Sequence, residues 1–98
     1  MAVYRLSPKA AADLDGIYEY TILNFGLEQA RDYLTGLHRH FQLLADHPRH
    51  GRSVKRLAPG LRRTEYQSHI VFYQQQSYGV LIVRVLHERM DVEAHLAE

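Results

Sequence analysis

The sequence contains no cysteine, and its longest run of aliphatic residues is only VLIV, at 80–83. Without cysteine the chain can form neither a disulfide nor a thiolate metal site, and cysteine usage does not reveal its redox compartment. A run this short cannot cross a bilayer. The N-terminus opens on MAVYRLSPKA, without the apolar region of a secretory signal. We therefore expect a cytoplasmic protein.

Motifs that would identify a particular enzyme class are also absent. The sequence has no glycine-rich phosphate loop, no HExxH motif, no acid-rich metal cluster and no serine in a nucleophile elbow. Its seven histidines are scattered, and His38 and His40 lie two apart on a predicted helix, where they face different directions. We expect no bound metal and no cofactor.

Length and composition predict one small folded domain over residues 1–98. A chain of 98 residues has no room for a second core. Its content of 46% hydrophobic and 23% charged residues is that of a globular protein rather than a disordered chain.

Positive charge is concentrated in one stretch, which we call the basic segment (residues 47–63). The net charge is only +1, because residues 1–46 hold four basic and six acidic residues, and residues 64–98 hold two and five. Such a block attracts phosphate or an acidic protein segment, although a solvated basic loop is the simpler interpretation. The segment has no acidic residue and carries Arg49, Arg52, Lys55, Arg56, Arg62 and Arg63.

The first half of the chain predicts a strand over 2–6 followed by two helices. Ser7 can cap free N–H groups and Pro8 suits the first helical position, so a helix starts here and ends before Gly26. A second helix is predicted from Leu27 to Asp46, and so tight a connection makes the pair a helical hairpin. The predicted buried face of the first helix comprises Ala10, Ala11, Leu14, Ile17, Tyr18, Thr21, Ile22 and Phe25.

The second half predicts a loop, three strands and a short helix. Prolines and glycines mark the basic segment as a loop. Residues 61–66, 69–76 and 79–87 then alternate as three strands with short connections, which is typical of an antiparallel meander. A last helix over 90–97 would be capped by Asp91. The fold class is therefore α+β, with the hairpin covering one sheet face and leaving the other open for function.

Alternation along the last strand predicts two faces. Arg84 falls in a strand that is otherwise apolar, where burial without a partner costs several kcal/mol. It should therefore open onto a wet groove or pair with an acid such as Glu65. The predicted faces are Leu81, Val83, Val85 and His87 on one side, and Val80, Ile82, Arg84 and Leu86 on the other.

One catalytic chemistry, metal-free RNA cleavage, is compatible with the residue types. It needs a base for the 2′-OH, cations for the phosphorane and an acid for the leaving oxygen. His87 could be the base, Arg84 with Arg63 the cations, and Glu65 or Tyr73 the acid. Alternation places Arg84 and His87 on opposite faces, which counts against this set.

Four ordered motifs resemble the RelE/ParE superfamily of bacterial toxins, and its ParE branch in particular. They are YRLSPKAAADLDGIYEYT, LLADHPRHGRSV, GLRRTEYQSHIVFYQ and IVRVLHERMD, which together span essentially the whole chain. The resemblance implies a strand, helical hairpin, three-stranded meander and short terminal helix. It also implies the toxin of a type II toxin–antitoxin module, without a cofactor, that acts on DNA gyrase and is neutralised by a ParD-type antitoxin.

The RelE and YoeB branches instead cut mRNA on the ribosome, with basic sheet residues and a Tyr or His near the C-terminus. This chain matches them at Arg63, Arg84 and His87. It has Glu88 where a terminal aromatic would follow, and only two lysines. A third interpretation is a non-toxic relative that only binds its antitoxin.

We therefore interpret Arg84 to Asp91 as part of a recognition surface rather than as a catalytic set. Bidentate arginines suit the binding of acidic side chains and carbonyls. The expected antitoxin-binding residues are Arg62, Arg63, Tyr73, Arg84 and His87. The candidates for contact with the target are Arg49, Arg52, Lys55, Arg56, Arg89, Met90 and Asp91.

Overall fold

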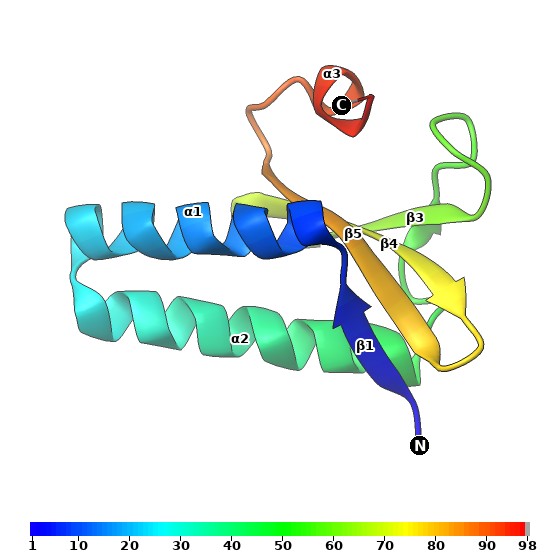
Figure 1. Cartoon of the computed structure of the whole chain (residues 1–98), viewed down its shortest axis with the longest axis horizontal. Helices are drawn as coiled ribbons and strands as arrows, with labels where there is room; N and C mark the ends of the chain where they lie inside the picture. The colour runs from blue at the N-terminus through cyan, green and yellow to red at the C-terminus, as the bar shows by residue number, and fades with distance from the viewer. Residues whose placement is uncertain (98) are drawn as a thin grey trace.

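Two long helices lie side by side and cover one face of a five-stranded sheet in the computed structural model, which describes residues 1–97 (Figure 1). The predicted hairpin, meander and short terminal helix are confirmed. The elements are β1 (Val3–Leu6), α1 (Pro8–Phe25), α2 (Leu27–Asp46), β2 (Arg52–Ser53), β3 (Leu61–Tyr66), β4 (His69–Gln76), β5 (Gly79–His87) and α3 (Val92–Leu96).

The helices begin and end at the residues that predicted their boundaries. The Ser7 side chain accepts a hydrogen bond from the Ala10 N–H at 3.0 Å at the start of α1. Gly26 stands between the two helices with φ 93°, a backbone conformation that residues other than glycine rarely adopt. Asp91 caps α3 by accepting from the Ala94 N–H at 3.2 Å.

The sheet order is β1-β5-β4-β3-β2, with β1 parallel to β5 and the other neighbours antiparallel. β2 was not predicted, and the placement of Arg52 and Ser53 in a loop is wrong: they pair with Arg63 and Arg62. Two residues are too few to show the alternation that marks a strand, so β2 can be recognised only by its pairing with β3 in the folded structure.

A β-bulge in β5 makes the predicted grouping of its faces wrong. Phe72 pairs with Arg84 and Tyr73 with Ile82, so Val83 has no partner on β4. One extra residue inverts the alternation of side chains that follow it. Arg84 and His87 still lie on different sides, but the helix-covered face now holds Val80 and Ile82 together with Val85 and His87.

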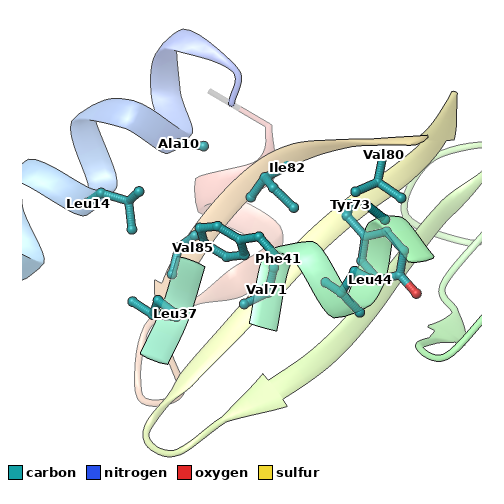
Figure 2. Close-up of a cluster of buried hydrophobic side chains, with 11 residues drawn as sticks. Ala10, Leu14, Leu37, Phe41, Leu44, Val71, Tyr73, Val80, Ile82 and Val85 are labelled. Atoms are coloured by element: carbon teal, nitrogen blue, oxygen red, sulfur yellow. The ribbon is translucent and has the colours of Figure 1, made fainter. Parts of the chain in front are cut away.

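The main core lies between the hairpin and this helix-covered face. Leu37, Phe41 and Leu44 of α2 are fully buried against the sheet (Figure 2). A second cluster, built on Leu61, Ile70, Phe72 and Leu86, occupies the opposite face beneath α3 and Val54, Leu57 and Ala58 of the basic segment. The expectation that this face is open is therefore wrong over much of its area, because the terminal helix and the loop cover it.

Arg84 is buried and paired with α1 rather than with Glu65. Its Nε and Nη2 donate to the two carboxylate oxygens of Asp13 at 2.8 and 2.9 Å, and Nη1 donates to the carbonyl of His95 in α3 at 2.8 Å. Glu65 instead accepts from Arg63 at 3.1 Å. The bidentate pair joins α1 and β5 across 71 positions of sequence.

The same carboxylate completes the edge of β5 beyond the end of β1. The Val85 N–H donates to Asp13 at 2.9 Å, the Ser7 N–H donates to the carbonyl of Ile82, and the Ser7 hydroxyl donates to that of Val83. Polar groups at the start of α1 thus take the place of a neighbouring strand, which leaves fewer free edge groups for unwanted pairing.

We predict that Asp13→Ala lowers the free energy of unfolding by about 3–5 kcal/mol, because it leaves the Arg84 guanidinium buried without its counterion. Urea denaturation followed by circular dichroism measures the change. Asp15→Ala, an exposed position on the same helix, is the matched control and should change stability by less than about 0.5 kcal/mol. Equal losses in both variants would contradict the role given to the ion pair.

Candidate functional site

A groove of about 790 Å³ runs between α1 and the ends of β4 and β5. Its rim is apolar: Tyr20, Phe25 and Met90 are 63%, 58% and 45% exposed. Phe25 was predicted to be buried, and this is wrong because the end of the hairpin extends beyond the sheet (Figure 1). The lining also includes Ala12, Asp13, Gly16, Ile17, Thr21, Gln29, Tyr33, Gln67, Ser68, His69, Val85 and His87.

Two histidines and a tyrosine form a polar cluster among the groove residues. The rings of His69 and His87, opposite each other on β4 and β5, meet edge to face with centroids 5.4 Å apart. The Tyr33 hydroxyl lies 2.6 Å from His69 Nδ1 and donates to the Tyr66 carbonyl at 3.3 Å. His87 Nδ1 accepts from the Arg89 N–H at 3.1 Å.

Burial shifts the pKa of His69 and of Tyr33 in this cluster. It lowers the pKa of His69, and the neighbouring His87 lowers it further, while the carboxylates of Glu88 and Asp13 act weakly in the other direction. Burial also raises the pKa of Tyr33. The groove therefore keeps both of these side chains uncharged near neutral pH.

The basic segment forms a second surface, on the β2 side of the sheet. Its apolar residues pack into the second cluster, so its cationic side chains point outward, and Arg49, Arg52, Lys55 and Arg56 are all exposed. Arg56 pairs with Glu93 at 2.9 Å, and Arg52 lies 4.0 Å from Glu65. Ion pairs this exposed contribute little to stability, so the charges stay available to a partner.

Tyr73 anchors the basic segment from inside the core. Its hydroxyl donates to the Pro48 carbonyl at 2.8 Å and accepts from the Gly51 N–H at 2.7 Å. Arg62 donates to the Gly51 carbonyl at 2.7 Å. A Cβ at Gly51 would lie 2.6 Å from that hydroxyl and 2.7 Å from the Arg63 carbonyl, so only glycine allows the backbone to approach this closely.

The residues proposed for RNA cleavage do not come together. Arg63 lies over the Phe72 ring on the opposite face and pairs with Glu65, while Arg84 is held by Asp13. His87 belongs to the groove on the helix side. Base and cations therefore have no common position for a phosphate.

The predicted antitoxin-binding residues are also divided. Tyr73 is completely buried and Arg84 is 8% exposed, so neither offers a surface in this conformation. Arg62 and Arg63 are partly exposed on β3, beside β2, and His87 lies in the groove. The assignment of antitoxin contacts stays a prediction, but only these last three have more than about a tenth of their surface accessible.

Of the target candidates at the end of β5, Met90 belongs to the groove rim, Asp91 caps α3, and Arg89 is exposed between His87 and Met90. Within residues 1–97, no three His, Asp or Glu side chains gather as a metal site would require. None of the helices in that range combines the length and apolar character needed to span a membrane.

Comparison with known proteins decides the family. A model of the ParE toxin of type II toxin–antitoxin systems, parDE, matches residues 4–92. The chain belongs to the ParE toxin family. Toxin ParE1 of Caulobacter vibrioides is 44% identical over 96 residues, covering 98% of this chain and 99% of that protein. Toxin ParE1 of Mycobacterium tuberculosis is 40% identical over 94 residues, covering 95% and 96%.

More distant ParE proteins match over similar lengths. Toxin ParE of Escherichia coli is 35% identical over 99 residues, covering 100% of this chain and 96% of that protein. The fold matches the chromosomal ParDE toxin–antitoxin system from P. aeruginosa, with TM-score 0.74, 22% identity, and coverage of 89% of this chain and 96% of that one. The resemblance to the ParE branch seen in the sequence is thus confirmed, and the chain is a ParE toxin of a type II system.

Sequence reasoning missed most of the ParE groove. Tyr33, His69 and Gly16 come from three elements and share no local motif. Two signals were present: the large apolar residues Tyr20, Leu23 and Phe25 exceed what one core face needs, and His69 stands opposite His87 at the open end of the meander.

We predict that Tyr73→Phe destabilises this ParE chain by about 1–3 kcal/mol, because the Gly51 N–H and Pro48 carbonyl lose their buried partner. Amide hydrogen exchange should accelerate at residues 48–53 more than in α1. Tyr20→Phe, at an exposed position, is the control and should change neither measurement. Unchanged exchange at 48–53 in Tyr73→Phe would refute the anchoring role.

Proposed function

We propose that this ParE chain inhibits DNA gyrase and is neutralised by a ParD-type antitoxin that binds along the groove. Family membership supports the choice of target and partner. The observation that carries the choice of binding over catalysis is the internal use of the arginines. The guanidinium of Arg84 is bound by the Asp13 carboxylate and the His95 carbonyl. Arg63 pairs with Glu65 and lies over Phe72, on the sheet face opposite His87.

The groove has the features of a site for an amphipathic helix. Its rim is formed by large exposed apolar side chains, and its size suits one face of a helix anchored at three- and four-residue spacing. The exposed apolar surface continues to Leu23 and Leu27 at the end of the hairpin, which are 77% and 46% exposed. Exposed patches of this kind mark interaction surfaces.

The antitoxin would leave the groove past the ends of β4 and β5. In this proposal His87 contacts it within the groove, and Arg62 and Arg63 contact a further segment along the β3 edge. Edge strand β2 has only two residues, so an extended segment could pair beside it. Arg84 and Tyr73 then act as internal supports for these contacts rather than as contacts themselves.

The exposed part of the basic segment is the proposed target surface. Arg49, Arg52, Lys55 and Arg56 project from a loop that packs on the second cluster and is held by Tyr73, so its charges are presented on a firm support. Acidic protein surface and the phosphates of DNA bound by gyrase would both be attracted by such a field.

We predict that Gly16→Leu weakens antitoxin binding more than tenfold without destabilising the fold. Gly16 lines the groove, and a Cβ there meets no atom within 4 Å, so a larger side chain would occupy space meant for the partner. Isothermal calorimetry measures the affinity and thermal unfolding the stability. Gly16→Ala is the matched control: it should keep the affinity and be slightly more stable, as alanine favours helix. Full affinity in Gly16→Leu would remove the groove from the proposal.

We predict that the purified chain inhibits supercoiling of relaxed plasmid by gyrase and increases linear, cleaved DNA. Reversing two charges, as Arg49→Glu with Lys55→Glu, should reduce this inhibition at least tenfold. Arg31→Glu with Arg39→Glu, two exposed positions on α2, makes the same change of net charge away from the basic segment and should leave inhibition intact.

Labelling in growing bacteria separates this function from its alternatives. Thymidine incorporation should fall before methionine incorporation after induction of the chain. An earlier fall of methionine incorporation would favour the ribosome-dependent mRNA endonuclease. Growth without arrest, with antitoxin binding retained, would favour the non-toxic relative.

A further inference from the structure

We propose that the antitoxin segment filling the groove places a carboxylate against the His69–His87 pair, and that His69 takes up a proton as it binds. This inference rests on the proposed function of the groove as the antitoxin site. It adds the chemistry of one contact: an aspartate or glutamate in an otherwise apolar helix face.

The hydrogen bonds of the pair assign different roles to the two rings. His87 Nδ1 accepts from the Arg89 N–H, so the neutral ring carries its proton on Nε2, and protonating Nδ1 would lose that bond. In this tautomer His87 is a donor through Nε2, the one nitrogen of its ring that the bond to Arg89 leaves for a partner.

The surroundings of His69 accommodate both its neutral and its protonated form. Its Nδ1 faces the Tyr33 hydroxyl at 2.6 Å, and that hydroxyl also reaches the Tyr66 carbonyl at 3.3 Å. When His69 is neutral with its proton on Nε2, the Tyr33 hydroxyl can donate to Nδ1 instead of to the Tyr66 carbonyl. When His69 is protonated, its Nδ1–H donates to the Tyr33 oxygen and the hydroxyl donates to Tyr66. Tyr33 thus gives Nδ1 of His69 a hydrogen-bond partner in both states.

The charges around the pair leave room for an added carboxylate. From α1, Asp13 is the only acidic residue among the described residues lining the groove, and its oxygens already accept from Arg84 and from the Val85 N–H. At the end of β5, Glu88 and Arg89 are both exposed and of opposite charge. Tyr33 on α2 and Tyr66 on β3 are uncharged.

The free groove keeps His69 neutral, because burial and the proximity of His87 lower its pKa. A carboxylate seated on the pair would reverse this preference, since an opposite charge within a few ångströms favours the charged imidazole. A partner that offered only an amide or a carbonyl could accept from Nε2 but would give no reason for a proton to bind. Proton uptake therefore distinguishes a carboxylate from neutral acceptors.

The test is calorimetry of the full-length chain with its full-length ParD-type antitoxin, at pH 7.0 in two buffers of different ionisation enthalpy. The difference in observed enthalpy gives the number of protons exchanged. We expect net uptake of about half a proton or more, and hence about threefold tighter binding for each pH unit lowered near neutrality. The sign follows because the bound state holds more protons.

Two variants identify the residue that takes up the proton. His69→Gln should abolish the uptake and bind less tightly, while His47→Gln, an exposed histidine outside the groove, should behave as wild type. Uptake near zero or proton release with the wild type, or unchanged uptake in His69→Gln, would overturn the inference. These wild-type titrations decide the matter even if His69→Gln fails to fold. Absence of any binding would overturn the proposed antitoxin groove as well, whereas tight binding without uptake overturns only the carboxylate.

Discussion

The buried pair of Asp13 and Arg84 is the contact on which the arrangement of the other elements depends. One carboxylate receives two guanidinium N–H groups and the Val85 N–H, and the third arm of the same guanidinium holds the carbonyl of His95. α1, β5 and α3 are thereby fixed to a single point. A buried pair adds less stability than its geometry suggests, because both charges lose their water. Its main effect is to allow one placement of α1 at the end of the sheet, and α1 is one wall of the groove.

Much of the fold could be predicted because its signals are local. Ser7-Pro8 and Gly26 mark the limits of α1, and the alternation of 61–87 with short turns gives the meander. The predictions that failed concern contacts between residues that lie far apart in the sequence. The bulge at Val83 is a property of the pairing between β4 and β5, and nothing in either strand alone marks it. Arg84 was expected either to open onto a wet groove or to pair with an acid such as Glu65. It does pair with an acid, but this partner, Asp13, lies 71 positions away on a helix, where no strand rule would place it.

The candidate site also has one part that could be predicted from local sequence and one part that could not. The basic segment is contiguous, so charge counting found it, whereas the groove is assembled from α1, α2 and the ends of two strands. Tyr73 shows the limit of alternation: the pattern gives two faces but not which one is covered, and this tyrosine belongs to the covered one. Its two hydrogen bonds to Pro48 and Gly51 nevertheless tie the core to the basic segment. A residue expected to contact the antitoxin therefore supports the proposed target surface from inside the core.

The parallel pairing of β1 with β5 sets the order in which the molecule can be completed during synthesis. Val3 to Leu6 pair with residues 79–82, which are made much later, and Asp13 has no partner until Arg84 has been made. At the rates of bacterial translation, roughly 4 to 14 seconds separate the synthesis of those two residues. Throughout that interval the residues of the hairpin that have been made have no complete sheet to pack against. The groove, with one wall from each end of the chain, is therefore among the last features to form. The proposed antitoxin site is complete only after the residues of β5 have been made.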